Sequence, residues 1–118
     1  MATVALSFDD NNGTDDPAFV FIHGWTCNRS FFAPQFDYFG SNHRAVAVDL
    51  RGHGDSPAAS DGVYSIVAFA EDVAELIDTL GIGPAVVVGH SLGGVITCQL
   101  AATRPDLVAC AVMVDPAP

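Results

Sequence analysis

The stretch VVVGHSLGG, residues 86–94, carries the strongest structural signal in this chain. A run of valines ends in Gly89, and Ser91 then stands midway between Gly89 and Gly93. A continuous apolar run bounded by turn residues is typical of a strand buried on both faces. The residues that follow, 92–104, are apolar on most sides and predict a buried helix. The stretch therefore predicts a strand that turns sharply into a helix, with Ser91 at the turn.

The rest of the chain alternates between strand and helix patterns. The helix expected at 65–81 has the clearest pattern, with apolar residues on one face and acids, including Asp72, mostly on the other. Ser65 is expected to cap its start and Gly81 to end it, and Ser30 is expected to cap an earlier helix. Strands that alternate with helices predict an α/β fold, with a mostly parallel sheet and helices on both faces. Strands are expected at 3–8, 18–22, 44–50, 85–90 and 107–115, a turn at 9–17, and helices at 30–39, 65–81 and 92–104.

The charge balance excludes some classes of partner. The 118 residues include 14 Asp and Glu but 4 Lys and Arg, for a net charge of -10. Nucleic acids and anionic membrane surfaces are bound by clustered basic residues, so neither is expected as a partner. The length suits one domain, and the acids are interpreted as charges that keep an apolar domain dispersed in water.

The cysteines and the first residues of the chain indicate in which compartment the protein resides and whether it binds a metal. Cys27, Cys98 and Cys110 form no CxxC pair, so no metal site is expected, and we interpret them as buried free thiols in a reducing compartment. The first residues, MATVALSFDDNN, have no basic start and no long apolar core, and therefore do not predict a signal peptide. No apolar run approaches the roughly 18 residues that span a membrane. A cytoplasmic location is expected.

The segment Gly89-His90-Ser91-Leu92-Gly93 matches the pattern G-x-S-x-G in its required context, after a strand and before a helix. In so tight a turn, side chains two residues before and two residues after the serine would collide, which explains the glycines. Ser91 would then lie above the carboxyl ends of the strands, and the N–H of Leu92 would point to where an oxyanion forms. The alternative is that Ser91 only caps the helix.

A second segment, His23-Gly24-Trp25, follows the strand expected at 18–22. An oxyanion hole of this kind takes its second N–H from a loop after the strand beside the serine-bearing strand, and Trp25 is placed to supply it. The alternative is a tight turn in which Trp25 covers the core. Further along, Phe31 and Phe32 are expected in the core, with a wall of the substrate site as the alternative.

The segment DLRGHGDS, residues 49–56, combines glycines with charges. We expect a loop near the rim of the site that is bonded to itself, with Asp49, Arg51 and His53 in structural roles.

Together, FIHGWTCNRSFFAPQ (21–35), VAVDLRGHGDS (46–56) and VVVGHSLGGVITCQLAATRPDLVACAVMVDPAP (86–118) resemble the α/β-hydrolase fold family, in its single-domain esterase and carbon–carbon-bond hydrolase branch. The resemblance implies a serine hydrolase that acts on a small ester-like substrate without a cofactor. Ser91 matches the nucleophile, and the N–H groups of Trp25 and Leu92 match the oxyanion hole. His23, Gly24 and His90 are expected to support the site.

The chain departs from the family order of Ser, then acid, then His. After Ser91 the acids are Asp106 and Asp115, and no histidine follows. Asp115 is a weak candidate for the acid, and His23 is the best of the earlier histidines as an unusual base.

We therefore expect residues 1–118 to form the N-terminal part of a single hydrolase core, without the C-terminal strands and lid. The alternative is a non-catalytic fragment that binds a ligand or a partner chain. An uncovered apolar strand at 107–115 also predicts a second chain, or self-association, that completes the sheet.

Overall fold

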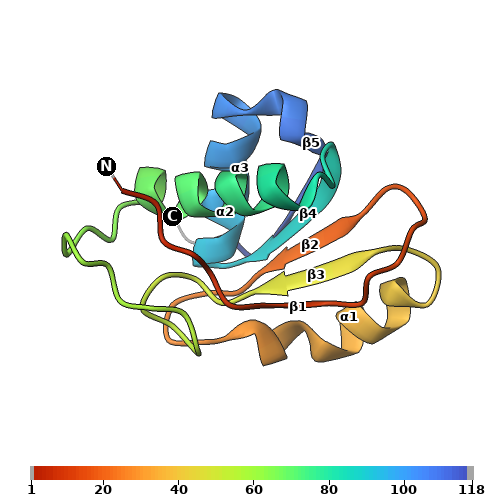
Figure 1. The fold of residues 1–118 in the computed structure, drawn as a ribbon, viewed down its shortest axis with the longest axis horizontal. Helices are drawn as coiled ribbons and strands as arrows, with labels where there is room; N and C mark the ends of the chain where they lie inside the picture. Colours follow the sequence, from red (N-terminus) through yellow and green to blue (C-terminus); the bar gives the residue numbers. More distant parts are fainter. Residues whose placement is uncertain (1, 117–118) are drawn as a thin grey trace.

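A five-stranded sheet lies at the centre of the chain, of which the computed structural model describes residues 2–116 (Figure 1). The order of the strands across the sheet is β1-β3-β2-β4-β5. The strands are β1 (Phe8–Asp10), β2 (Phe19–Ile22), β3 (Ala45–Val48), β4 (Ala85–His90) and β5 (Val108–Val114). The helices are α1 (Ala33–Gly40), α2 (Ile66–Leu80) and α3 (Leu92–Thr103), with short 3₁₀ turns η1 (Arg29–Phe32) and η2 (Pro105–Leu107).

Most of the strand pairings are parallel, which confirms the predicted sheet. β2 pairs in parallel with β3 and with β4, and β4 pairs in parallel with β5, while the short β1 runs antiparallel to β3. Ile22 of β2 lies beside Gly89 of β4. The residues that follow these two strands therefore emerge at the same edge of the sheet, which brings the loop from His23 onward next to Ser91.

Helices cover both faces of the sheet, as predicted (Figure 1). α2 and α3 pack against each other on one face, and α1 lies on the other. The larger core includes Val48, Phe69 and Ile96. The smaller core includes Phe21 and Phe32. Because both faces are covered, the central strands are apolar along their whole length, which is why they read as continuous runs in the sequence.

α2 begins and ends where the sequence predicts. The hydroxyl oxygen of Ser65 accepts a hydrogen bond from the N–H of Ala68 at 3.1 Å, and Gly81 adopts the left-handed φ of 65° that ends the helix. The cap expected at Ser30 is wrong. The side-chain oxygen of Asn28 accepts from the N–H of Ser30 at 2.9 Å, so the helical segment starts earlier, with η1.

The first strand lies later than predicted. The sequence predicts a strand at 3–8, whereas β1 begins only where that range ends. The N–H of Val4 donates to the carboxylate of Asp72 at 2.8 Å, and the N–H of Ser7 donates to the hydroxyl oxygen of Ser56 at 2.8 Å. Because remote side chains hold this part of the backbone, it does not join the strand ladder.

The three cysteines are free thiols, but the expectation that they are buried is wrong. Cys98 and Cys110 are exposed, and Cys27 is half-buried. Cys98 faces outward from α3, and Cys110 lies on β5, the last strand in the sheet order. Their exposure follows from their place in the fold, which amino-acid composition does not reveal.

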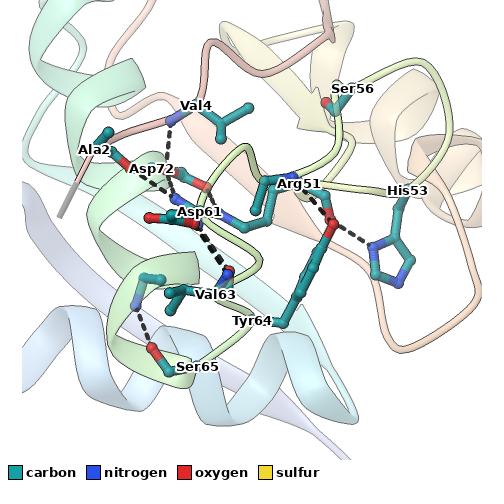
Figure 2. A network of polar contacts seen from close by, with 12 residues as sticks. Ala2, Val4, Arg51, His53, Ser56, Asp61, Val63, Tyr64, Ser65 and Asp72 are labelled. Carbon is teal, nitrogen blue, oxygen red and sulfur yellow. Dashed lines mark hydrogen bonds and ion pairs between the residues drawn. The ribbon is translucent and has the colours of Figure 1, made fainter.

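A buried ion pair joins the long loop after β3 to α2 (Figure 2). Arg51 donates through Nε and Nη2 to the two carboxylate oxygens of Asp72, at 2.6 and 2.7 Å, and both side chains are almost fully buried. The same guanidinium donates to the carbonyl oxygens of Val63 at 2.9 Å and Ala2 at 3.2 Å. The expectation that Asp72 lies on the exposed face of the helix is therefore wrong. The spacing of acids along a helix cannot predict that an arginine from another segment will pair with one of them in the interior.

Replacing Asp72 tests how much this ion pair stabilises the fold. Asp72→Asn leaves the buried guanidinium of Arg51 without its counter-charge, and we expect the free energy of unfolding to fall by about 3–5 kcal/mol. Glu71→Gln removes a carboxylate from the exposed side of the same helix turn, and is expected to change stability by less than about 0.5 kcal/mol. Urea unfolding followed by circular dichroism measures both. Equal stabilities of the two variants would contradict the assignment.

Candidate active site

Ser91 lies at the turn between β4 and α3 in an unusual backbone conformation. Its φ is 54° and its ψ is -116°. A positive φ is costly for a residue with a side chain and persists only where the surrounding structure enforces it. Ser91 occupies the N-cap position of α3, but its side chain makes no capping hydrogen bond. The hydroxyl is therefore not used to cap the helix, and the interpretation of Ser91 as a simple cap fails.

The two glycines around Ser91 are required by close approach of the backbone. A Cβ atom added to Gly89 would overlap the carbonyl of Gly93 and the hydroxyl of Thr97. A Cβ atom added to Gly93 would overlap the carbonyl oxygen of Ile22 on β2. β4, α3 and β2 therefore meet at a point where no side chain fits, as the G-x-S-x-G spacing predicts.

The loop after β2 lies directly against Ser91. A Cβ atom added to Gly24 would lie 3.2 Å from the Cβ atom of Ser91. The N–H of Cys27 closes a turn onto the carbonyl of Gly24 at 3.2 Å, so Trp25 is held at the start of this turn. Within residues 2–116, the backbone N–H groups of Trp25 and Leu92 donate no hydrogen bond to the backbone. The structure thus leaves both proposed donors free beside the serine.

His23 is fully buried and both of its ring nitrogens are engaged. Nε2 accepts from the N–H of Leu50 at 3.0 Å, which leaves the proton on Nδ1 for donation to the carbonyl of Gly24 at 2.7 Å. Burial, which disfavours the charged imidazolium, lowers the pKa of His23 from its ordinary value, and the nearby His53 adds to this effect. His23 therefore positions the loop that carries Gly24, and it has no free lone pair with which to accept a proton from Ser91.

His90 precedes Ser91 and stacks on Phe31. The two ring centroids are 4.7 Å apart with an angle of 27° between the planes. Nδ1 of His90 is buried and has no hydrogen-bond partner among residues 2–116. This stack is not predictable from the sequence, because Phe31 and His90 are far apart along the chain and meet only through the fold.

Asp115 lies beside the serine turn. The N–H of Ser91 donates to the carbonyl of Val114 at 3.0 Å, and Asp115 is the next residue, exposed and with a φ of 47°. Its carboxylate forms no hydrogen bond or ion pair with the part of the chain that the structure describes. The fold therefore places this acid at the correct edge of the sheet, but no imidazole links it to Ser91.

Asp49 holds the loop after β3, in agreement with its expected structural role. Its buried carboxylate accepts from the N–H groups of Arg29 at 2.7 Å and Asp55 at 2.9 Å, and it forms an ion pair with the Arg29 guanidinium. Gly54 is required here, because a Cβ atom at this position would overlap the Asp49 carboxylate. Sequence reasoning missed Arg29, whose partners come from two other segments: Asp9 from β1, and Asp49 and Asp55 from the loop after β3.

Cavities, metal-binding clusters and membrane-spanning helices add nothing to the site around Ser91 in the described range. Three cavities of about 350, 360 and 340 Å³ occur in the structure, and none of these three borders Ser91. Across residues 2–116, no three His, Cys, Asp or Glu side chains are placed to hold a metal ion. No helix in that range is long and apolar enough to cross a membrane.

The sheet order, the serine turn and the adjoining loop define an α/β hydrolase. The chain belongs to the α/β-hydrolase fold family, whose sequence profile matches residues 17–118. This confirms the resemblance and the fold class expected from the sequence.

Curated relatives are hydrolases of several kinds. A 2-(acetamidomethylene)succinate hydrolase of Mesorhizobium japonicum is 41% identical over 99 residues, which cover 84% of this chain and 35% of that protein. An sn-1-specific diacylglycerol lipase of Mus musculus is 39% identical over 104 residues, which cover 86% of this chain and 33% of that protein. The chain thus spans about a third of the length of these two relatives.

Solved structures share the fold. The enol-lactonase of Burkholderia xenovorans superposes with a TM-score of 0.82 at 32% identity, over 89% of this chain and 41% of that protein. An esterase of Thermogutta terrifontis superposes with a TM-score of 0.82 at 32% identity, over 90% of this chain and 38% of that protein. These similarities support an esterase-like hydrolase core.

Replacing Gly93 tests the steric basis of the serine turn. Gly93→Ala forces α3 away from β2, and we expect the free energy of unfolding to fall by more than about 2 kcal/mol. Gly94→Ala is the matched control, because a Cβ atom there meets its nearest neighbour, Pro116, at 3.2 Å, a tight contact that a small shift of Pro116 relieves, and alanine favours the helix. Chemical unfolding of both variants measures the difference. A Gly93→Ala variant as stable as Gly94→Ala would show that the close approach is not required.

Proposed function

We propose that Ser91 is the nucleophile of a serine hydrolase that acts on small ester-like substrates without a cofactor. The observation that carries this proposal is the backbone of Ser91, held at a positive φ between two glycines that no other residue could replace. Strain of this kind persists where the fold enforces it, and it leaves the half-buried hydroxyl at the start of a helix without a capping bond. Hydrolases among the relatives and esterases among the similar structures support the same reaction class.

The reaction would follow the usual course of acyl transfer. The Ser91 oxygen bonds to the ester carbonyl carbon while its proton passes to a base, and the carbonyl oxygen becomes an oxyanion. The backbone N–H groups of Leu92 and Trp25 are proposed to bind that oxyanion. Its collapse expels the alcohol, which takes up the proton, and water then releases the acid and restores the serine.

The base is the missing element. No hydrogen bond joins the Ser91 hydroxyl to an imidazole or carboxylate within the described range, residues 2–116. His23 is committed to Leu50 and Gly24. We propose that the base is an imidazole outside this range, consistent with the family order in which the histidine follows the serine. In its absence, residues 1–118 would be the N-terminal part of one hydrolase core with little activity of its own.

The second candidate function is non-catalytic binding by the same fold. It is favoured by a different observation: within residues 2–116, no base is hydrogen-bonded to the Ser91 hydroxyl. The two functions differ in the reactivity of Ser91, because a ligand-binding remnant does not require a reactive hydroxyl.

We also propose a cytoplasmic location for the chain. Exposed free thiols such as Cys98 and Cys110 persist in reducing compartments and are oxidised in secreted proteins.

Labelling with a fluorophosphonate tests the proposed nucleophile. Attack by Ser91 forms the oxygen–phosphorus bond, releases fluoride and gives its proton to the buffer. We expect a single adduct on Ser91, formed at least about 10³-fold more slowly than in a hydrolase with a complete triad. Added imidazole should accelerate labelling by serving as the absent base. Intact mass and peptide mapping measure the adduct.

Ser91→Ala is the control for this experiment and should remain unlabelled with or without imidazole. Labelling at another residue, or no labelling of the wild-type chain even with imidazole present, would refute the nucleophile and favour the non-catalytic function.

We further propose that residues 1–118, when no further strands cover β5, associate through this strand, which pairs with β5 of a second copy. β5 is an end strand of the sheet, bonded to β4 on one side. Its side chains Val112, Met113 and Val114 are 38–45% exposed, and the strand VACAVMV contains no charge. Two identical uncharged strands can pair about a two-fold axis without like charges meeting, which covers an apolar edge that would otherwise face water.

A charge on β5 tests this pairing. Val112→Lys places an ammonium group on the edge strand, and we expect the chain to change from a concentration-dependent dimer to a monomer. Val67→Lys makes the same substitution at an exposed valine of α2 and should leave the dimer intact. Size-exclusion chromatography with light scattering measures the mass. A monomeric wild-type chain at every concentration would contradict the pairing.

A further inference from the structure

Two exposed aromatic residues each adjoin a residue that lies next to Ser91. Trp25 is 52% exposed and follows Gly24, which lies against the serine. Phe31 is 48% exposed and stacks on His90, the residue before the serine. Large apolar side chains exposed near a candidate nucleophile are typical of a binding surface for an apolar ligand.

Phe31 is not needed for the core. Its neighbour Phe32 is 4% exposed, and the Phe32 ring packs against Phe21 with centroids 5.3 Å apart. The Phe31 ring touches the Phe32 ring at 5.4 Å, edge to face, and otherwise points toward His90 and solvent. Because Phe32 fills the core position, the exposed ring of Phe31 has no packing role that requires an aromatic residue.

The stack of Phe31 on His90 makes one wall of the site apolar. The rings lie nearly parallel at 4.7 Å, so Phe31 covers one face of the imidazole. Nδ1 of His90 is buried without a hydrogen-bond partner in residues 2–116, and a Cβ atom on Gly24 would lie 3.6 Å from it. The wall therefore presents the apolar face of the Phe31 ring to a ligand, and the imidazole nitrogen Nδ1 of His90 stays buried behind it.

Trp25 forms the second part of this surface, and contacts with Phe69 and His53 hold its ring. Its ring lies 5.6 Å from Phe69 of α2, edge to face, and 5.5 Å from His53. Contacts with a core phenylalanine hold the indole in place while half of it remains exposed. A rigid aromatic surface of this kind binds apolar groups at a low entropic cost.

The negative net charge of the chain disfavours the binding of anionic ligands at this surface. Its net charge is -10, and Asp115 is exposed next to the Ser91 turn. An acidic field of this kind repels a ligand that carries a carboxylate and leaves a neutral ligand unaffected.

We propose that Phe31, stacked on His90, and Trp25 form an acyl-binding surface that selects neutral esters with apolar acyl chains over esters that carry a carboxylate. This inference rests on the proposed function of Ser91 and names its substrate class. The acyl chain would lie across the exposed ring faces, with its carbonyl group between Ser91 and the N–H groups of Leu92 and Trp25.

Fluorescence of Trp25, the single tryptophan of the chain, reports binding without any reaction. The ligands are methyl butanoate, methyl hexanoate and methyl octanoate, with monomethyl succinate as the anionic comparison. We expect the affinity to rise about twofold with each added methylene, since an open surface covers only part of the chain. Monomethyl succinate should bind at least about tenfold more weakly than methyl hexanoate.

Variants at Phe31 identify the surface. Phe31→Ala should weaken methyl octanoate binding about tenfold, and Phe31→Leu, which keeps most of the apolar area, should stay within about threefold of wild type. Tyr38→Ala removes a 74% exposed aromatic ring from α1, away from the site, and should change nothing. Circular dichroism verifies folding of each variant.

Ser91→Ala separates this inference from the proposed function, because it removes the nucleophile and leaves the aromatic surface. Retained binding by Ser91→Ala, with no fluorophosphonate adduct on the wild-type chain, would refute the hydrolase and preserve the acyl-binding surface. Affinity independent of chain length in the wild type, equal binding of monomethyl succinate and methyl hexanoate, or unchanged binding by folded Phe31→Ala would overturn the inference. The comparison of chain lengths and the comparison of monomethyl succinate with methyl hexanoate use the wild-type chain alone, so they test the inference even if a variant fails to fold.

Discussion

The close approach of three backbone segments at Gly89, Gly93 and Ile22 is the constraint on which the rest of the structure depends. α3 can start directly on the sheet only because no side chain stands between its first turn and the end of β2. The same contact enforces the positive φ of Ser91. The orientation of the serine, the position of the neighbouring loop and the packing of α3 are therefore consequences of one steric fit.

The features that were predictable from the sequence are those that local chemistry determines. Apolar runs identified the central strands, and Ser65 and Gly81 marked the ends of α2 because capping depends on neighbouring residues. The Ser91 turn was predictable for the same reason, since its glycines lie two residues away on each side.

The features that were missed depend on partners from remote segments. Asp72 was expected in solvent, yet Arg51 from the long loop makes it part of the interior. Phe31 and Phe32 are adjacent residues of the same type, so the sequence does not distinguish them. In the fold, Phe32 packs in the core against Phe21, whereas Phe31 stacks on His90. Neither the sequence nor the structure assigns a base to Ser91, because both ring nitrogens of His23 are engaged elsewhere and no hydrogen bond joins another described imidazole to the serine hydroxyl.

The few basic residues also have a role that composition alone did not suggest. All four are arginines, and each joins separate segments: Arg29 to Asp49, Arg44 to Asp10, Arg51 to Asp72 and Arg104 to Asp78. The positive charges of the chain thus cross-link segments of the fold, in its interior at Arg51 and on its surface at Arg104. The remaining acids account for the negative surface that the net charge implies.

The sheet order has a consequence for how the chain is made. From β2 onward, β3 and then β1 lie on one side, while β4 and β5 are added outward on the other in the order in which they are synthesised. A chain that emerges from the ribosome can therefore add β4 and then β5 to pairs that already exist, without opening any of them. Assembly can therefore keep pace with translation, and the serine turn gains its last backbone hydrogen bond, from the N–H of Ser91 to the carbonyl of Val114, once β5 has left the exit tunnel.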